Sequence, residues 1–338
     1  MELFGLDRAE LSSLSEQLGQ STFRGKQIAD WLYKKGVRET GSMSNLPVAM
    51  REELARTATI SRCEIVTQSR AADGTVKYLL RLGDGETIES VLLPYPDRTT
   101  VCVSTQVGCP AKCLFCATGM SGFVRNLTAG EIVDQALTLQ EQAFGRVTHV
   151  VLMGMGEPLM NFDNVVKALR LLNDELGIGM RRLALSTVGL PGAIRKLKEL
   201  DLQITLAVSL HAPEDALRQR LIPLATHHPL KELIQACREY ADFTKRRITF
   251  EYLLLAGVND SPEQASALAN LLRHTLCNVN LIGFNEVPSI TYRRPSREAI
   301  AAFRSVLEDA GIQVTQRMER GHSISAACGQ LRRRHTSR

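Results

Sequence analysis

From about residue 98 onward, apolar segments of strand length alternate with amphipathic segments of helix length. The apolar segments are rich in Val, Ile, Leu and Thr, which favour strands. The longer segments, such as 128–144 and 162–176, repeat apolar residues every three or four positions, as helices do. This alternation predicts an α/β fold of parallel β/α units, built either as an open sheet or as a partial barrel. The predicted strands are 100–107, 147–153, 182–187, 204–210, 247–255 and 279–284.

The first 97 residues have a different pattern. Residues 1 to about 60 predict helices, including one over 24–36 with its apolar residues on one face and Gly36 as a stop signal. Residues 76–94 predict two strands joined at Gly83-Asp84-Gly85, a typical hairpin turn. The chain is therefore expected to begin with a small helical unit and a β-hairpin before the β/α units start.

The loops that follow five of the predicted strands are rich in residues that bind ligands. They read GCPAKCLFCATG after the first strand, GMGEP after the second, STVGLPG at the third, SLHAP at the fourth and GFNEVP at the sixth. Parallel strands end at one edge of a sheet or barrel, and ligands bind at that edge in both architectures. We therefore expect these loops to form a single site.

Composition supports a globular protein with an anionic partner. Of the 338 residues, 44% are hydrophobic and 23% are charged, enough for one large domain with appendages. The formal net charge of +5 is mild, and each arginine run taken alone is typical of a solvated face. Together these runs favour a partner such as RNA. The runs lie at 180–182, 245–247, 292–294 and 331–338.

Neither a secretory signal nor a membrane span is evident. The N-terminus has no cationic start followed by an apolar block, and no apolar run approaches the length that crosses a bilayer. We therefore expect a cytoplasmic protein. Thiols stay reduced in that compartment, so its eight cysteines suggest metal binding or catalysis rather than disulfides.

Three of the cysteines, Cys109, Cys113 and Cys116, lie on one short loop with C-x3-C-x2-C spacing. A structural zinc site or an ordinary iron–sulfur cluster uses four protein ligands. No second pair with metal-binding spacing follows, and buried structural cysteine is the better interpretation for those at 63, 237 and 277. Three thiolates can instead hold three irons of a [4Fe–4S] cluster and leave the fourth open to a small molecule.

Two further cysteines have distinct settings. Strand alternation puts Cys102 on the polar face with Ser104, which in a barrel would point into the lumen beneath the cysteine loop. Taken alone, such a cysteine is more often part of a core. Cys328 lies in ISAACGQL, where small residues and Gly329 allow close backbone approach.

The cysteine loop resembles the signature of radical S-adenosylmethionine enzymes, in which the cofactor's amino and carboxylate groups bind the open iron. Over residues 20–332 the chain is similar to the RlmN/Cfr family of radical enzymes that methylate adenine carbons in RNA. The matching motifs are FRGKQIADWLY, CVSTQVGC, FCATG, RNLTAGEIVDQ, MGMGEPLMN, STVGLPG, VSLHAP, GVND and AACGQL, in the family's order.

The resemblance implies a domain organisation. It predicts a helical, RNA-binding accessory domain over 1–60 and a β-hairpin linker over 61–97. A partial (β/α)6 TIM-like barrel follows over 98–290. The C-terminal extension over 291–338 would carry the methyl-accepting Cys328.

The resemblance also implies a reaction. Adenine C2 is electron-poor and cannot attack a methyl sulfonium directly. One S-adenosylmethionine would therefore methylate Cys328, and a second would yield the radical that activates this methyl group for addition to adenine. Cys102 would attack the sulfur of Cys328, releasing the base and leaving a disulfide. Glu89 in ETIESVLLP matches the proposed proton acceptor, although sequence alone would favour a solvated strand carboxylate.

Cofactor contacts and partners carry over in the same way. Gly156 and Glu157 match the contact to the cofactor's amino group, and the implied ligands of the [4Fe–4S] cluster are Cys109, Cys113 and Cys116. Further matching positions are Ser186, Ser209, Leu210, His211 and Asn285. The expected substrates are 23S rRNA, in its peptidyl-transferase loop, and tRNA, at the adenosine 3′ of the anticodon. An electron donor such as flavodoxin or ferredoxin with its reductase is also expected, and the protein should act as a monomer.

The chain departs from the family pattern in two places, and two alternative functions stay open. GFNEVP has Glu286 where the family often has proline, and RGHSIS before AACGQL lacks the family's acidic residues. A Cfr-like adenine C8 methyltransferase is the alternative within the class, but Pro158 matches the C2 group, whereas Cfr proteins typically have alanine. A metal-stabilised RNA-binding protein without catalysis is the other alternative, and it would need neither Cys102 nor Cys328.

Overall fold

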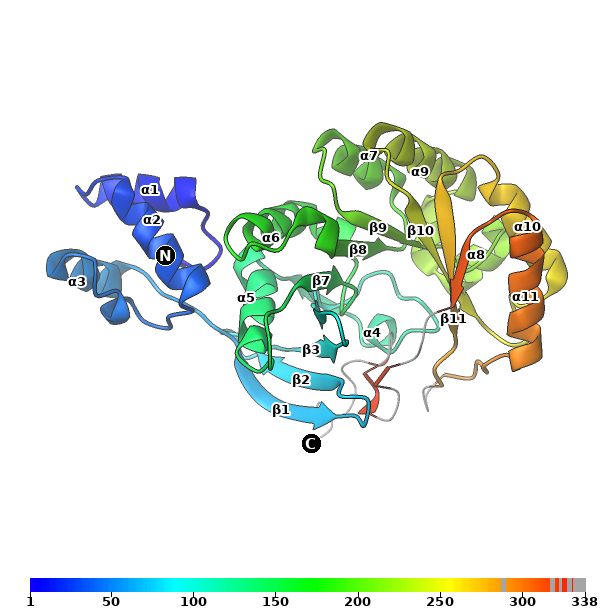
Figure 1. The fold of residues 1–338 in the computed structure, drawn as a ribbon, viewed down its shortest axis with the longest axis horizontal. Helices are drawn as coiled ribbons and strands as arrows, with labels where there is room; N and C mark the ends of the chain where they lie inside the picture. The colour runs from blue at the N-terminus through cyan, green and yellow to red at the C-terminus, as the bar shows by residue number, and fades with distance from the viewer. Residues whose placement is uncertain (287–289, 317–319, 322–323, 327–329, 331–338) are drawn as a thin grey trace.

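The computed structural model describes residues 1–286, 290–316, 320–321, 324–326 and 330, and a single large sheet dominates it (Figure 1). The sheet has ten strands in the order β1-β2-β3-β4-β7-β8-β9-β10-β11-β12 within the described residues. The strands from β4 to β12 run parallel to their neighbours. The predicted α/β fold with parallel β/α units is therefore confirmed.

Each of the six predicted strands has a counterpart in the parallel part of this sheet, and one short strand was not predicted. The counterparts are β4 (Thr99–Cys102), β7 (His149–Leu152), β8 (Leu183–Thr187), β9 (Thr205–Ser209), β10 (Ile248–Leu254) and β11 (Cys277–Gly283). The additional strand, β12 (Val314–Gln316), pairs with β11 over only three residues. Its brevity explains why no strand-length apolar pattern marks it.

Helices line the outer side of the curved sheet (Figure 1). Their apolar stripes face the strands, as in α6, where Val165, Leu169 and Leu172 are buried. The long helices are α5 (Ala129–Gln140), α6 (Phe162–Asp174), α7 (Pro191–Glu199), α9 (Leu230–Thr244), α10 (Pro262–Leu272) and α11 (Arg297–Asp309). Shorter ones are α4 (Ala117–Met120), η3 (Pro158–Asn161), η4 (Met180–Arg182), α8 (Asp215–Leu221) and η5 (Pro223–His227). No helix in the described part of the chain is long and apolar enough to cross a membrane.

The first predicted strand, 100–107, is divided in the structure. β4 ends at Cys102, and β5 (Gln106–Gly108) turns away to pair with β6 (Phe123–Asn126) in a separate antiparallel ribbon. The break lies at Ser104, whose N–H donates to Oε1 of Gln135 at 2.7 Å and whose carbonyl accepts from Nε2 of the same side chain at 2.9 Å. Because one amide side chain on α5 satisfies both backbone groups, Ser104 needs no neighbouring strand.

The predicted hairpin is part of a larger meander. β2 (Val76–Arg81) and β3 (Thr87–Pro94) pair antiparallel around Gly85, as expected, but β1 (Glu64–Arg70) also pairs with β2. β3 in turn pairs antiparallel with β4. The three strands thus continue the barrel sheet, so the segment that the sequence predicts as a linker is joined to the barrel by backbone hydrogen bonds.

The N-terminal unit is helical, as predicted. Its elements are α1 (Arg8–Gln17), α2 (Phe23–Ala29), η1 (Asp30–Lys34), η2 (Thr40–Ser42) and α3 (Val48–Thr57). Asp7 and Glu10 form a capping box that starts α1. α1 and α2 pack closely because Gly25 has no side chain: a Cβ there would lie 2.4 Å from the backbone nitrogen of Ser12. Gly36 ends the second helical segment with a φ of 63°.

Buried and half-buried ion pairs attach this unit to the barrel. Arg62, which follows the helical unit, is almost fully buried against Asp134 of α5 and also contacts Glu141 at 3.0 Å. Its Nη1 donates to the carbonyl of Gly36 at 2.8 Å. Arg62 therefore joins the helical unit to α5 with one side chain.

Asp134→Ala is expected to lower the free energy of unfolding by about 3–5 kcal/mol, because it leaves the buried Arg62 cation with the half-exposed Glu141 as its one remaining charged partner among the described residues. Urea titration of the metal-free chain measures the change. Glu53→Ala is the control, since it breaks the exposed Arg56–Glu53 pair and should cost no more than about 1 kcal/mol. Equal effects of the two substitutions would contradict a structural role for the buried pair.

Candidate active site

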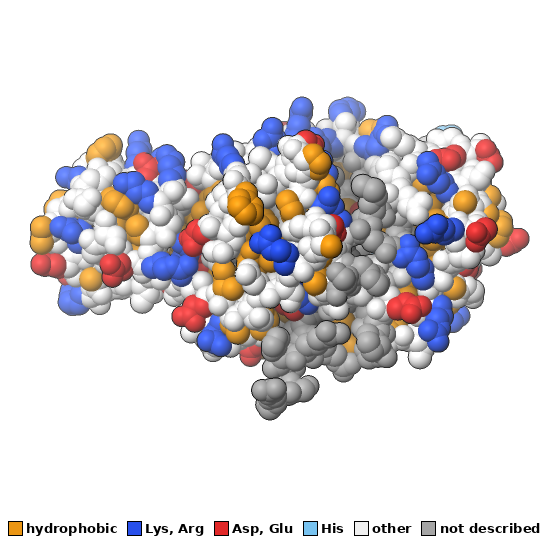
Figure 2. Space-filling model, turned by 60° about the horizontal axis from the view of Figure 1, so that its bottom comes forward, with side chains coloured by type: hydrophobic (Ala, Val, Ile, Leu, Met, Phe, Trp, Pro, Cys, Tyr) orange, Lys and Arg blue, Asp and Glu red, His pale blue; other side chains and the backbone are white. Residues whose placement is uncertain are grey.

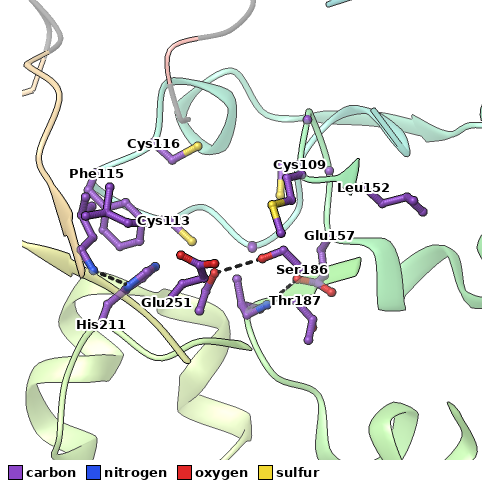
Figure 3. A pocket seen from close by; sticks show the side chains of 18 of the residues that line it. Cys109, Cys113, Phe115, Cys116, Leu152, Glu157, Ser186, Thr187, His211 and Glu251 are labelled. Carbon is purple, nitrogen blue, oxygen red and sulfur yellow. Dashed lines mark hydrogen bonds between the residues drawn. The ribbon is translucent and has the colours of Figure 1, made fainter. Parts of the chain in front are cut away.

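One pocket lies where the parallel strands end, and loops from five regions of the chain meet in it (Figure 3). Nine residues predicted from the sequence line it: Cys109, Cys113, Cys116, Gly156, Glu157, Ser186, Ser209, His211 and Asn285. The expectation that the loops share one site is therefore met. Leu210 does not line the pocket, because its side chain is fully buried in the core.

The cysteine loop is held in shape by its own backbone. The N–H of Cys109 donates to the carbonyl of Gly122 at 2.9 Å, and that of Cys116 donates to the carbonyl of Cys113 at 3.2 Å. The loop folds tightly enough that a Cβ at Gly119 would lie 2.8 Å from the backbone nitrogen of Cys113. This contact explains the glycine in FCATG, because any side chain there would push the cysteine loop open.

Burial makes negative charge on these thiols costly. It raises the pKa of Cys109 to about 12 and that of Cys113 well above its usual range, and neighbouring cysteines add to both shifts. Such thiols ionise only where a cation neutralises them, as a bound metal does. The donor set thus suits a thiolate-bound metal centre.

The GMGEP loop brings a carboxylate into the pocket. Gly156 has a φ of 112°, and a Cβ there would lie 2.7 Å from Oγ1 of Thr105, so only glycine fits. Glu157 beside it is buried, and its carboxylate accepts from the N–H of Leu159 at 3.0 Å and from that of Val188 at 2.7 Å. Burial raises its pKa to about 7 despite these hydrogen bonds. Both oxygens retain lone pairs for a cationic ligand.

The ends of β8 and β9 supply hydroxyls and an imidazole. The Oγ atoms of Ser186 and Ser209 lie 3.5 Å apart, and both residues line the pocket. His211 has a φ of 59°, and its Nδ1 accepts from the N–H of Leu253 at 3.0 Å, so the ring proton lies on Nε2. Burial lowers the pKa of His211 to about 3, so the ring is neutral. The His211 ring lies nearly perpendicular to the ring of Phe115, with the two centroids 4.9 Å apart.

Asn285 gives evidence that the pocket accepts a polar ligand. The residue is buried and lines the pocket, and its Oδ1 has no hydrogen-bond partner among the described residues. A buried acceptor without a donor is costly unless a ligand supplies one. The ammonium, hydroxyl and amino groups of S-adenosylmethionine are donors of this kind. The pocket residues therefore fit this cofactor.

The three thiols of the cysteine loop lie at different places around the pocket (Figure 3). No group of three His, Cys, Asp or Glu side chains in the described segments converges closely enough to hold one ion. A [4Fe–4S] cluster instead takes each thiolate on a different iron, so its ligands surround it. Cys109, Cys113 and Cys116 border the pocket from separate positions in Figure 3, as such ligands would.

The pocket contains residues that the sequence analysis missed. Glu251 lies on β10, is buried, and accepts from Nδ2 of Asn280 at 2.8 Å. Phe115 and Phe284 add aromatic surface. A carboxylate in the middle of the apolar segment RITFEYLLL was the available signal for Glu251, since a charged side chain on an interior strand faces a cavity or a partner.

A second group of predicted residues lies at the meander. Glu89 on β3 and Cys102 at the end of β4 are both buried, and neither lines the pocket. Oε1 of Glu89 lies 3.2 Å from Nζ of Lys77, and the same ammonium donates to the carbonyl of Ser325 at 3.2 Å. Ser325 precedes Cys328 by three residues, and Cys328 itself lies outside the described residues.

The segment leading to Cys328 is attached to the meander by contacts that the sequence did not predict. The N–H of Gly321 donates to Oδ2 of Asp73 at 3.0 Å, Nη1 of Arg320 donates to the carbonyl of Pro94, and the Arg320 guanidinium lies 4.2 Å from the ring centroid of Tyr95. The segment RGHSIS has no acidic residue of its own. Its hydrogen bond to a carboxylate, from the N–H of Gly321, is made instead to Asp73 in the turn between β1 and β2.

Two family models match the chain. The model of the radical SAM superfamily matches residues 103–269, and that of the ribosomal RNA large subunit methyltransferase N-terminal domain matches residues 1–60. The first match includes the cysteine loop and the strands β7 to β10, and residues within it line most of the pocket. The second covers the helical unit.

Similar proteins match nearly the whole chain. The probable dual-specificity RNA methyltransferase RlmN of Gloeobacter violaceus is 51% identical over 335 residues, covering 99% of this chain and 96% of that relative. The protein of the same description from Trichormus variabilis is 53% identical, covering 98% of this chain and 93% of that relative. The crystal structure of a radical SAM methyltransferase from Sphaerobacter thermophilus has a TM-score of 0.93 at 46% identity, covering 98% of this chain and 99% of that one. The chain therefore belongs to the RlmN-type family of radical SAM methyltransferases.

Proposed function

We propose that this enzyme methylates C2 of an adenosine in the peptidyl-transferase loop of 23S rRNA and of the adenosine 3′ of the anticodon in tRNA. Curated relatives named dual-specificity RNA methyltransferases support both substrates. Pro158, which matches the C2 group of the family, supports C2 over C8. It is the first residue of η3 and follows Glu157 directly.

The pocket residues would hold the cofactors. Cys109, Cys113 and Cys116 would bind a [4Fe–4S] cluster, and the cluster with S-adenosylmethionine would supply the electron, the radical and the methyl group. The buried carboxylate of Glu157 would accept hydrogen bonds from the cofactor's ammonium. Oδ1 of Asn285 would gain the donor that it lacks. The other predicted contacts are Gly156, Ser186, Ser209, Leu210 and His211, of which Leu210 would act through its backbone because its side chain belongs to the core.

Two cysteines and one carboxylate would carry the chemistry on RNA. The sulfur of Cys328 would carry the methyl carbon, which would lose one hydrogen atom to the radical that the bound cofactor supplies and would then bond to adenine C2. Glu89 would accept the proton that leaves C2, and the unpaired electron left on the ring would return to the cluster. The thiolate of Cys102 would then attack the sulfur of Cys328, so that an S–S bond forms as the S–C bond breaks, and the released carbon would take up a proton to become the methyl group of the base. A dithiol reductant would be needed to restore both thiols.

The observation that carries this proposal is the link through Lys77. Its ammonium contacts both the carboxylate of Glu89 and the carbonyl of Ser325, and so connects the proposed proton acceptor to the segment that leads to the proposed methyl carrier. On the other side of Cys328, Nε2 of Gln330 donates to the carbonyl of Glu286, next to Asn285 of the pocket. An RNA-binding protein without catalysis would not need these connections.

The target adenine would have to leave the base stack, since stacking shields C2 from the residues of the site. Unstacking costs roughly a few kcal/mol. Lys and Arg side chains are spread over the helical unit and the barrel on the face seen in Figure 2. On the helical unit Lys26 and Lys35 are exposed, and Nζ of Lys35 lies 3.4 Å from the ring centroid of Trp31. Cations of this kind favour phosphate binding that weakens as salt rises.

Mass mapping of the modified nucleoside tests the proposal. The reconstituted enzyme is incubated anaerobically with a reductant, S-adenosylmethionine and unmodified 23S rRNA or tRNA, and the digested RNA is compared with synthetic standards. We expect 2-methyladenosine from both RNAs with the unsubstituted enzyme and none with Cys328→Ala. Formation of 8-methyladenosine would contradict C2 methylation and would show the Cfr-like C8 activity instead. RNA binding without any methylated product would support the non-catalytic alternative.

A further inference from the structure

Arg218 is a buried cation that has no role in the function proposed above. It lies in the middle of α8, the short helix after β9, and only 1% of its surface is exposed. Burial lowers its pKa to about 10, so the guanidinium still carries its charge at neutral pH. Burying a charge is costly unless an opposite charge or a full set of acceptors compensates it.

The protein itself compensates this charge only in part. Nη2 donates to the carbonyls of Val188 and Ser209, the latter at 3.5 Å. Nε and Nη1 are buried without a hydrogen-bond partner, and Arg218 forms no salt bridge with a carboxylate, among the described residues. Asp215, one turn earlier on α8, instead accepts from the N–H of Leu230 at 2.8 Å. Among the described residues Arg218 therefore has no direct ion-pair partner, and the carboxylates of Asp215 and Glu157 offset its charge only from beyond salt-bridge distance.

The cysteine loop packs on the same helix. The N–H of Leu114 donates to the carbonyl of Leu221, the last residue of α8, at 3.0 Å. Cys113 belongs to one apolar cluster with Leu217 and Leu221 of that helix. Of the groups whose negative charge would stabilise Arg218, Cys113 contributes most. Arg218 therefore lies behind the pocket wall, next to the most deeply buried thiol of the loop.

We propose that Arg218 is the buried counter-charge of the iron–sulfur cluster, acting through Cys113, and that it raises the cluster's reduction potential. Adding an electron to a thiolate-bound cluster adds negative charge in a medium of low dielectric constant. A fixed cation nearby stabilises the reduced state more than the oxidised state. Arg218 does not line the pocket, so it would act on the cluster through its charge and not by contact, as a positioning residue. This inference rests on the three-cysteine ligand set proposed above.

The test compares a neutral with a charged replacement in the reconstituted enzyme. Arg218→Gln removes the charge but keeps a donor for the carbonyls of Val188 and Ser209, whereas Arg218→Lys keeps the charge. Arg220→Gln is the matched control, because Arg220 lies on the same helix and is exposed. Iron content is measured first, and the midpoint potential of the cluster is then determined by EPR-monitored titration without S-adenosylmethionine.

We expect Arg218→Gln to retain iron and to shift the midpoint potential to more negative values, while Arg218→Lys and Arg220→Gln stay at the wild-type potential. Loss of the cluster in Arg218→Gln but not in Arg218→Lys would also support the counter-charge. An unchanged potential in Arg218→Gln, or equal changes in both Arg218 variants, would overturn it. A separate measurement tests the ligand set itself. If Cys113→Ala retained its full iron content, the proposed three-cysteine ligand set would be wrong.

Discussion

Replacing Cys102 with alanine is expected to trap the enzyme as a stable covalent adduct with its RNA. The remaining thiol, Cys328, could still be methylated and still bond through its methyl carbon to adenine. No neighbouring thiolate could then displace the sulfur, so the S–C bond would persist. After anaerobic turnover, a denaturing gel should show an RNA-bearing protein band in stoichiometric yield, and free methylated RNA should fall below detection.

Two variants make this result specific. Cys328→Ala should form no adduct and no product, because the proposed methyl carrier is missing. Cys237→Ala removes another buried thiol and should turn over without an adduct, because Cys237 lies on α9 within the main core. Free turnover by Cys102→Ala, or an adduct in Cys328→Ala, would mean that the roles of the two thiols are wrongly assigned.

Cys113→Ala is expected to abolish the iron–sulfur cluster. The chain would then offer two loop thiolates for a cluster that is proposed to have three protein ligands, and Arg218 would stay buried without the thiolate that contributes most to offsetting its charge. Iron, sulfide and the broad visible absorption should all be lost, and with them S-adenosylmethionine cleavage. Anaerobic reconstitution followed by iron analysis measures the loss.

The cluster test also needs variants that leave the ligand set intact. Cys102→Ala and Cys328→Ala should retain wild-type iron, since the proposal gives neither a place in the cluster. Circular dichroism of each variant checks that the fold is intact. Iron loss in either of these two variants, with the fold retained, would argue against a cluster held by Cys109, Cys113 and Cys116 alone.

The β/α units and the shared pocket were predictable because both follow from local rules. Strand and helix segments differ in apolar period and length, and parallel strands must end at one edge. The motifs after the strands therefore had to meet, and nine of the predicted residues line the same pocket. Two glycines of these motifs, Gly119 and Gly156, have close contacts that exclude a side chain.

Features that depend on distant contacts were not predictable in this way. The first strand was expected over 100–107, but the side chain of Gln135 takes both backbone groups of Ser104 and ends β4 early. The hairpin looked like a linker because its sequence pattern is local, whereas the pairing of β3 with β4 is not. Leu210 matched a cofactor-contacting position, yet its side chain belongs to the core.

The sequence by itself determined the fold class, the cysteine loop and the family, because each can be recognised from residues that are close together along the chain. Only the tertiary structure decided how distant charges meet. Lys77 contacts Glu89 and also the carbonyl of Ser325, which lies 248 residues further along the chain. Arg218 is buried on the helix that packs against the loop of Cys113, although Cys113 comes 105 residues earlier in the sequence. Such residues act on a site through space. Burying their charge costs free energy, and this cost shows that each needs a partner, but it arises only once the chain is folded.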